Sequence, residues 1–278
     1  MILVVGGGGM LGRDLLELLG ERGRGVDLPE IDITDLLSVQ RVLTTLKPKV
    51  VVNCAAYTNV DGCESNAETA MQVNGEGVAF LAMISREIGA KLVQVSTDYV
   101  FDGGKGAPCL EDDLPRPLSV YGESKLAGEL NADVNPDNLV VRTQWLYGRH
   151  GTNFVETMLR LGREKQELTV VDDQIGSPTW TVDLAAGIVS LIDRDCRGVY
   201  HCVNSGSTSW NGFAKAIFEE AGMAVKVAPM STEQLNRPAR RPLYSVLDCG
   251  KLAADTGFTP RPWREALRQY LLVREKER

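Results

Sequence analysis

The sequence predicts an α/β protein with a Rossmann-type, doubly wound parallel sheet and a smaller C-terminal lobe. Short apolar runs alternate with segments of helical period through the first half of the chain. These runs are apolar at nearly every position, which is typical of parallel strands covered by helices on both faces. The first run ends in the glycine-rich turn "GGGGMLG" at residues 6–12, where a doubly wound fold carries its nucleotide-binding loop.

The individual elements follow in a regular order. A helix over 32–46 has Thr34 or Asp35 in place to cap it. After about Trp145 the alternation becomes less regular. The expected strands are 2–5, 25–28, 49–56, 91–96, 138–143, 168–173 and 198–203, and the expected helices are 10–23, 32–46, 67–89, 119–133, 153–165, 181–193, 209–222 and 263–275.

We expect two lobes of one unit rather than two independent domains. Residues 1–148 form the dinucleotide-binding lobe, and residues 149–278 form mainly the substrate-binding lobe. Residues 174–204 are expected to cross back into the first lobe. No internal repeat and no low-complexity linker separates the two.

The composition restricts the class of partner. The chain has 278 residues and a formal charge of −7, so we expect no nucleic-acid partner. Six cysteines without a CxxC pair are expected to be reduced thiols in a cytoplasmic protein. Met1 is followed directly by "ILVVGGGG", from which we expect neither a leader nor a membrane anchor. Two histidines offer little for a metal site, and the basic end "REKER" is expected to be a solvated tail.

The glycine-rich turn predicts a dinucleotide site. Gly6, Gly9 and Gly12 have a GxxGxxG spacing between the first strand and the first helix. Glycine lets the backbone approach a diphosphate, and the helix N-terminus offers free N–H groups to it. Asp27, near the end of the second strand, can bond the ribose hydroxyls and favours NADH. Arg22 and Arg24 could instead meet a 2′-phosphate, so NADH and NADPH both remain open.

A second group of residues predicts ketone chemistry. The strand at 91–96 leads into Thr97 and Asp98, at the carboxyl end where a doubly wound sheet binds its ligand. Tyr121 and Lys125 lie one helical turn apart in the next helix. An ammonium beside a phenol lowers the pKa of the phenol, and a hydroxyl at Thr97 can bond a carbonyl oxygen. The alternative for the Tyr–Lys pair alone is a solvated helix surface.

Together these motifs resemble extended short-chain dehydrogenase/reductases, most of which act on nucleotide sugars. More narrowly, the chain resembles the dTDP-4-dehydrorhamnose reductase family along nearly its whole length. The stretches that carry the resemblance are, in order, "DITD", "VNCAAYTNVDGCE", "STDYVFDG", "PLSVYGESKLAGE", "VVRTQWLYG", "NFVETML", "DDQIGSPTWTVDLA" and "RPARRPLYSVLD".

The resemblance implies NAD(P)H-dependent reduction of the 4-keto group of dTDP-4-dehydro-6-deoxy-L-mannose to give dTDP-L-rhamnose. It implies that Tyr121 donates the proton, that Lys125 lowers its pKa and binds ribose, and that Thr97 stabilises the oxyanion. The cofactor-binding residues that it implies are Gly6, Gly9, Met10, Leu11, Gly12, Asp27, Asp32, Ile33, Ala56, Tyr57, Thr58, Tyr121 and Lys125, and the substrate-binding residues are Thr97, Asp98, Trp145, Asn153 and Arg240.

Structural alternatives exist for several of these residues. Trp145 could be core packing, Asn153 a helix cap and Asp98 a turn residue. Arg240, like its neighbour Arg241, could be a surface charge. The sequence itself does not decide between these readings.

The resemblance also bears on rival activities. Relatives that dehydrate nucleotide sugars carry Asp-Glu after the catalytic Thr, whereas Asp98 is followed here by Tyr99, which disfavours a dehydratase. Some members bind Mg²⁺ through glutamates at a subunit contact. The corresponding positions hold the shorter Asp14 and Asp183, which makes Mg²⁺ doubtful and leaves a homodimer open. The alternatives are another 4-keto-deoxysugar nucleotide as substrate, or a non-catalytic subunit of the methionine adenosyltransferase type.

Overall fold

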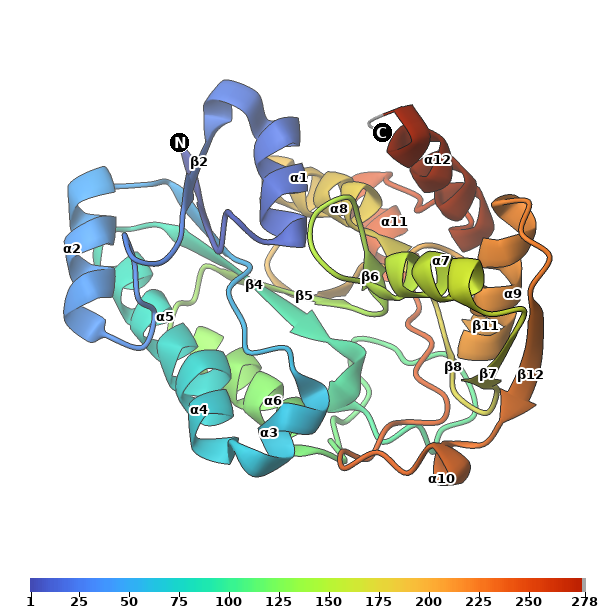
Figure 1. The fold of residues 1–278 in the computed structure, drawn as a ribbon. Helices are drawn as coiled ribbons and strands as arrows, with labels where there is room; N and C mark the ends of the chain where they lie inside the picture. The colour runs from blue at the N-terminus through green and yellow to red at the C-terminus, as the bar shows by residue number, and fades with distance from the viewer. Residues whose placement is uncertain (277–278) are drawn as a thin grey trace.

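A parallel sheet of six strands lies at the centre of the fold (Figure 1). The structure is a computed structural model that describes residues 1–276, so the last two residues of the expected basic tail lie outside the described part. The strands lie in the order β10-β5-β4-β3-β1-β2, and every pairing is parallel. Their bounds are β1 (Ile2–Val5), β2 (Gly23–Val26), β3 (Val50–Asn53), β4 (Lys91–Thr97), β5 (Asn138–Thr143) and β10 (Gly198–His201).

Helices cover both faces of this sheet, and others build a second unit beside it (Figure 1). In chain order they are α1 (Met10–Leu19), α2 (Leu36–Leu46), α3 (Val60–Ser65), α4 (Ala67–Met71), α5 (Gly77–Glu87), α6 (Val120–Ala132), α7 (Phe154–Glu164), α8 (Thr181–Asp193), α9 (Trp210–Glu220), α10 (Thr232–Leu235), α11 (Gly250–Thr256) and α12 (Trp263–Lys276).

Alternate residues of each strand pack on opposite faces of the sheet. In β1, Ile2 and Val4 join α1 and α8 in one apolar cluster. Leu3 and Val5 instead join α2 and α5 in a second cluster on the other face. The inner strands are mostly apolar because both faces of the sheet are buried, whereas the edge strand β2 carries the exposed Arg24. This arrangement confirms the predicted doubly wound fold. The strand order reverses between β1 and β3, so the loops after these two strands border the expected ligand site.

A separate apolar cluster forms the C-terminal unit. It joins residues of α7, α9 and α12, with Phe213 and Tyr270 among those that are almost completely buried. The same part of the chain also returns to the main sheet, since β10 pairs with β5 and α8 packs against α1. The short strands pair as β6 (Leu146–Tyr147) with β9 (Thr179–Trp180), β7 (Glu167–Val171) with β12 (Lys226–Met230), and β8 (Ile175–Gly176) with β11 (Thr208–Ser209).

Two local features differ from the sequence expectation, and a third confirms one of its two alternatives. The expected helix over 67–89 consists of α4 and α5 joined by a π-helical segment, η2 (Gln72–Glu76). The second strand ends at Val26, one residue before Asp27. Asp35, and not Thr34, caps α2, because its carboxylate accepts from the N–H of Leu37. Among residues 1–276, no helix is both long and apolar enough to span a bilayer.

Candidate functional site

The glycine-rich turn between β1 and α1 leaves no room for side chains at two positions. Gly6 has a φ of +76°, and a Cβ there would lie 2.7 Å from the backbone N of Ala55. A Cβ on Gly12 would lie 2.3 Å from the carbonyl oxygen of Gly6. The backbone therefore closes tightly before α1 starts at Met10, and Gly9 at the N-cap brings no side chain to the first N–H groups of the helix. This geometry suits a dinucleotide diphosphate.

Asp27 lies against this turn, as the sequence predicts. Its Oδ2 accepts a hydrogen bond of 3.0 Å from the N–H of Gly8. Arg22 and Arg24, the candidates for a 2′-phosphate, are paired elsewhere, with Asp193 at 2.9 Å and Glu30 at 3.1 Å. Two charged groups thus contact the turn: the carboxylate of Asp27, and the guanidinium of Arg13, whose Nε donates to the carbonyl oxygen of Gly8 at 2.9 Å. Arg22 and Arg24 have other partners.

The segment after β3 is held by a residue that the sequence does not single out. Asn74, in η2, accepts from the N–H of Tyr57 at 2.8 Å and donates to its carbonyl oxygen at 3.0 Å. It also donates to Ser124 Oγ in α6 at 3.0 Å. One buried amide thereby ties the 56–58 segment to the helix that carries Tyr121, and π-helical segments are frequent at functional sites.

The two residues expected beside adenine have different surroundings. Asp32 is half-buried and accepts from both the N–H and the hydroxyl of Thr34. Ile33 is buried in the cluster between the sheet and α2 and α5. Their contact with adenine stays a prediction.

Thr97 and Tyr121 come together at the end of β4. Both side chains are buried, which raises the pKa of Tyr121, and the neighbouring Thr97 hydroxyl opposes that rise. The helix α6 approaches closely because Gly122 faces the chain after Thr97, where a Cβ would lie 2.3 Å from the carbonyl oxygen of Tyr99. The ring of Tyr99 contacts that of Tyr121 edge to face, with centroids 5.4 Å apart. The hydroxyl and the phenol predicted from sequence thus form one site.

Asp98 is a buried carboxyl beside this pair. Thr97 Oγ1 donates to its Oδ1 at 3.1 Å, and Ser245 Oγ donates to its Oδ2. Burial raises the pKa of Asp98 to about 7, and the hydrogen bonds from Ser245 and Thr97 oppose that rise. Asp98 is therefore more than an exposed turn residue, although its contact with substrate stays a prediction.

Lys125 was expected to lower the pKa of Tyr121, and this expectation needs correction for the protein without bound cofactor. Burial raises the pKa of Tyr121 above its usual range, and the neighbouring Thr97 hydroxyl only opposes this rise. Lys125 Nζ donates instead to the carbonyl oxygen of Val95 at 2.7 Å. Burial lowers the pKa of Lys125 to about 8, while the charge of Glu129 acts against this change. Desolvation outweighs charge attraction because both side chains are buried.

Two of the residues predicted to bind substrate, Trp145 and Asn153, have different structural surroundings. Trp145 is half-buried, with a φ of +48°, and its ring stacks on Trp210 with centroids 3.7 Å apart. Asn153 caps α7: its Oδ1 accepts from Glu156 N–H at 3.1 Å and its Nδ2 donates to Gly148 O at 2.8 Å. The cap reading of Asn153 is therefore what the structure shows, and a contact with the diphosphate stays a prediction.

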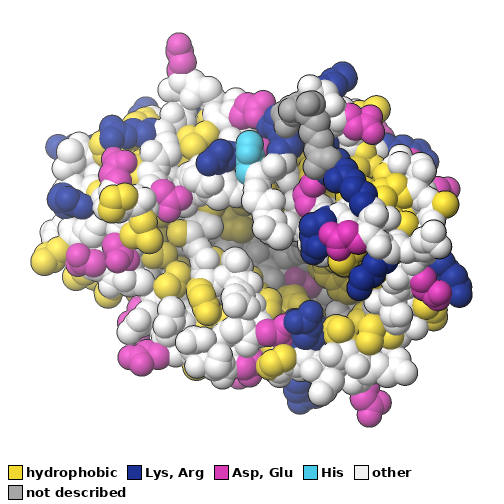
Figure 2. Space-filling model, in the orientation of Figure 1, with side chains coloured by type: hydrophobic (Ala, Val, Ile, Leu, Met, Phe, Trp, Pro, Cys, Tyr) yellow, Lys and Arg dark blue, Asp and Glu magenta, His cyan; other side chains and the backbone are white. Residues whose placement is uncertain are grey.

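A cavity of about 430 Å³ lies between the two lobes, beside Tyr99. Figure 2 shows the hollow on this face, between the half that carries α2–α5 and the half that carries α7, α9 and β12. Arg237 and Arg241 line the cavity, whereas Arg240 is exposed and does not. The choice of Arg240 is thus corrected to its neighbours. The other lining residues are Asp61, Tyr99, Phe154, Met158, Thr169, Val170, Val171, Gln174, Trp210, Met230 and Leu235.

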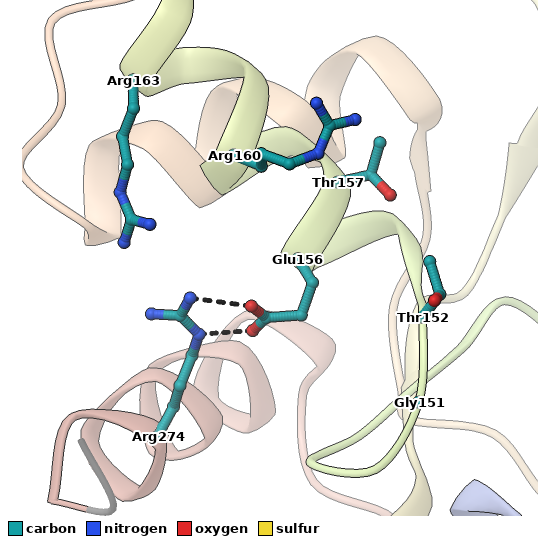
Figure 3. Close-up of a pocket in the computed structure, with 7 residues that line it drawn as sticks. All are labelled: Gly151, Thr152, Glu156, Thr157, Arg160, Arg163 and Arg274. Atoms are coloured by element: carbon teal, nitrogen blue, oxygen red, sulfur yellow. Dashed lines mark hydrogen bonds and ion pairs between the residues drawn. The ribbon is translucent and has the colours of Figure 1, made fainter.

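A second cavity of about 440 Å³ lies between α7 and α12. It also contains arginines, but Figure 3 shows Arg274 turned onto Glu156, with Nη2 2.7 Å from Oε2. Arg160 pairs with Glu164 at 3.3 Å within α7. Arg274, expected in a solvated tail, is instead only 12% exposed at its side chain. Neither Thr97 nor Tyr121 lines this second cavity.

The positions discussed for Mg²⁺ have internal partners. Thr181 Oγ1 donates to Asp14 at 2.5 Å, and Asn204 donates to Asp183 at 2.7 Å. Arg261 pairs with Asp183 at 2.9 Å. Within the described range 1–276, His, Cys, Asp and Glu do not gather in groups of three or more that could hold a metal ion. These residues do not fit a Mg²⁺ site.

The chain matches a known protein family along almost its full length. The family described as "RmlD substrate binding domain" matches residues 1–275. The chain belongs to this family. It is 47% identical to dTDP-4-dehydrorhamnose reductase of Streptomyces griseus, over 95% of this chain and 91% of the relative. It is 42% identical to dTDP-4-keto-6-deoxy-D-glucose reductase of Streptomyces niveus, over 96% and 95%.

The fold of the family agrees with that of this chain. A crystal structure of dTDP-4-dehydrorhamnose reductase from Bacillus anthracis str. Ames, in complex with NADP, has a TM-score of 0.95. It is 42% identical, and the match covers 98% of each chain. The resemblance drawn from the motifs is thus confirmed at the level of the family and the fold.

Proposed function

We propose that this chain reduces the 4-keto group of dTDP-4-dehydro-6-deoxy-L-mannose with NAD(P)H, giving dTDP-L-rhamnose. The observation that carries the proposal is the buried placement of Tyr121 beside Thr97 at the end of β4, with the ring of Tyr99 against that of Tyr121. This site lies on the edge of the sheet that also carries the glycine turn after β1. The relatives named as dTDP-4-dehydrorhamnose reductases, one of them in complex with NADP, support the substrate and the cofactor.

Each of the three catalytic residues has a proposed role. The bound nicotinamide supplies a hydride to C4 of the sugar. Tyr121 donates its proton to the C4 oxygen, and its high pKa in the buried site keeps that proton in place until the oxygen becomes basic. Thr97 donates a hydrogen bond to the same oxygen as negative charge develops on it. Lys125, in α6 with its Nζ bonded to the carbonyl oxygen of Val95 in β4, binds the nicotinamide ribose and brings a positive charge toward Tyr121.

The dinucleotide contacts are proposed as the sequence implied them. Met10 and Leu11, at the start of α1, offer backbone N–H groups to the diphosphate, and Gly9 lies beside them with its own N–H donated to the carbonyl oxygen of Gly6 at 3.0 Å. Asp27 binds the adenosine ribose. The closed turn at Gly6 and Gly12 supports this placement, because a Cβ at either position would fill it. Ala56, Tyr57 and Thr58 line the nicotinamide ribose.

The substrate contacts are proposed around the cavity between the lobes. Asp98 and Trp145 hold the deoxysugar, and Arg237 and Arg241 meet its diphosphate. Guanidinium groups are suited to this role because their planar forks match phosphate oxygens. We also propose the lobes 1–148 and 149–278, with elements of about 174–204 crossing back into the first lobe. The pairing of β10 with β5 in the main sheet supports this crossing.

A steady-state assay tests the proposal. NADPH or NADH oxidation should be measured with dTDP-4-dehydro-6-deoxy-L-mannose and with dTDP-4-keto-6-deoxy-D-glucose. We expect the first sugar to give a kcat/KM at least about tenfold higher. A higher value for the second sugar would contradict the assignment of substrate.

The second candidate function follows from that comparison. The relative from Streptomyces niveus is named for the D-glucose-derived sugar and is 42% identical. Hydride transfer would be the same, and only the pocket around the sugar would differ. Dinucleotide binding without turnover of any sugar nucleotide would point to the non-catalytic subunit instead.

The remaining parts of the proposal concern surroundings and assembly. A cytoplasmic location is supported by the free thiols of all six cysteines, which lie within residues 1–276. A formal charge of −7 supports the absence of a nucleic-acid partner. The homodimer stays a proposal, and light scattering of the purified chain would test it.

A further inference from the structure

A carboxylate from the dinucleotide-binding half directly contacts the arginine segment at the wall of the cavity between the lobes. Asp61 lies in the first turn of α3 and lines the cavity together with Arg237 and Arg241. Its Oδ1 accepts a hydrogen bond of 3.2 Å from the N–H of Ala239, and its Oδ2 accepts one of 3.0 Å from Arg241. Arg237 Nη1 lies 3.5 Å from the same Oδ2. One side chain thus meets three donors of segment 237–241.

The charge of this carboxylate is supported by its neighbours. Burial by itself raises the pKa of Asp61, but the hydrogen bonds from Arg241 and Ala239 and the charges of Arg241 and Arg237 outweigh it. The net pKa lies below the usual range, so Asp61 is ionised at neutral pH. A charged acceptor makes stronger hydrogen bonds to guanidinium groups than a neutral one.

Arg241 is fixed by further contacts. Its Nη1 donates to the carbonyl oxygen of Ala239 at 2.8 Å, and Tyr99 lines the same cavity beside it. The ring of Tyr99 in turn contacts Tyr121. The guanidinium is therefore held at a set position relative to the proposed proton donor. A guanidinium has five N–H donors, so donors remain for a ligand in the cavity.

We propose that Asp61 is a positioning residue for recognition of the nucleoside diphosphate, acting by holding Arg237 and Arg241 in the orientation that receives phosphate oxygens. This inference rests on the proposed function, because it takes the cavity as the place of the substrate's diphosphate. Guanidinium forks bind phosphate tightly only when their plane is set. Loss of Asp61 frees segment 237–241 from α3, and affinity for the diphosphate falls, whereas contacts with the nucleoside remain.

Binding measurements on the full chain with NADPH present test this inference. The affinities of dTDP and of thymidine, which lacks the diphosphate, should be compared for the wild type and Asp61→Ala. We expect the Kd of dTDP to rise about tenfold and that of thymidine to change less than about twofold. Asp61→Asn keeps an acceptor for Ala239 but loses the charge, so an intermediate rise of about threefold is expected. The matched control is Arg240→Ala, in the same segment but exposed and outside the cavity lining, which should change neither Kd.

Two outcomes would overturn the inference. An equal loss of affinity for both ligands would show that Asp61 only supports the fold. An unchanged or tighter dTDP affinity would show that Asp61 does not orient the arginines, or competes with phosphate for them. If Asp61→Ala fails to fold, Asp61→Asn and Arg241→Lys carry the test, and Arg241→Lys should lose dTDP affinity selectively because it keeps the charge without the fork.

Turnover of the wild type separates this inference from the proposed function. A wild type that binds dTDP but reduces no keto-sugar nucleotide contradicts the proposed reaction alone. A wild type that turns over while the Asp61 variants bind dTDP normally contradicts the role of Asp61 alone.

Discussion

Two of the cavities that contain arginines have nearly the same volume, about 430 and 440 Å³, but differ in how their charges are held. Between the lobes, Arg241 is anchored by Asp61 from another part of the chain and lies beside Tyr99. Between α7 and α12, Arg274 is turned onto Glu156 (Figure 3). Volume and arginine content therefore do not distinguish a binding site from a gap between helices. The difference is the convergence of groups from both lobes on Tyr121.

The largest effect is expected on kcat when Tyr121 is replaced, in contrast to Tyr270 beside the second cavity. Tyr121→Phe should lower kcat about 10²–10⁴-fold, because the proton donor to the C4 oxygen is lost. NADPH affinity, measured by fluorescence titration, should change less than about twofold, because the diphosphate contacts remain. The matched control is Tyr270→Phe, whose hydroxyl bonds Glu156 beside the second cavity, and its kcat should stay near that of the wild type. An undiminished rate for Tyr121→Phe would refute the assignment of the proton donor.

A second variant concerns the glycine turn, which only the site-bearing lobe contains. Gly12→Ala places a Cβ 2.3 Å from the carbonyl oxygen of Gly6, so the turn must open. We expect the Kd of NADPH to rise at least about tenfold. Gly104→Ala is the control, since its Cβ would meet only the side chain of Asp102, at 3.3 Å. Equal Kd values for both variants would argue against a dinucleotide at this turn.

The two cavities can be compared directly by truncating one arginine in each. Arg241→Ala should raise the KM for the dTDP-sugar about tenfold through loss of a charge-assisted contact with the diphosphate. Arg160→Ala, in the second cavity, should leave KM within about twofold. Steady-state kinetics measures both. A larger effect for Arg160→Ala would reverse the choice of cavity.

A smaller effect is expected in the pH dependence of stability. Burial lowers the pKa of Lys125 to about 8, below the usual 10.5, so the folded state releases this proton first. Between these pH values the unfolded chain holds more protons, and stability rises with pH by up to about 1.4 kcal/mol per unit. The unfolding free energy of the wild type should therefore rise relative to Lys125→Met between pH 8 and 10.5.

The control for this comparison is Lys226→Met, at a side chain that is 74% exposed. Its difference from the wild type should stay constant over the same pH range. Denaturant titration at several pH values measures both differences. A constant difference for Lys125→Met would show that the buried amine does not release its proton in the folded state.

Features that follow from strand ends were predictable from the sequence. The glycine turn, Asp27, Thr97 and Tyr121 each lie at or near the carboxyl end of a strand, and parallel pairing brings these ends to one edge. Their spacing along the chain was enough to predict these residues, because the fold itself brings the strand ends together. The apolar runs and helical segments predicted a doubly wound parallel sheet, but they did not predict the order of its strands.

Features that depend on packing between distant elements were not predictable. Asn74 and Asp61 act on residues that lie 17 and 180 positions away, respectively, and no local pattern marks either of them. Segment 237–242 has no helical or strand periodicity that would show which of its side chains face the cavity. The sequence therefore predicted Arg240 as a substrate-binding residue, whereas Arg241 lines the cavity. The direction of the Tyr121 pKa also depends on burial, which spacing to Lys125 does not reveal.

The central claim is transfer of a hydride from the nicotinamide to C4 of the sugar. The most direct measurement uses NADPH deuterated at the transferring C4 position, with dTDP-4-dehydro-6-deoxy-L-mannose as substrate and mass and NMR analysis of the product. We predict one deuterium at C4 of the dTDP-L-rhamnose formed, in amounts equal to the NADPH oxidised. Absence of sugar-dependent oxidation, or a product without deuterium at C4, would contradict the claim.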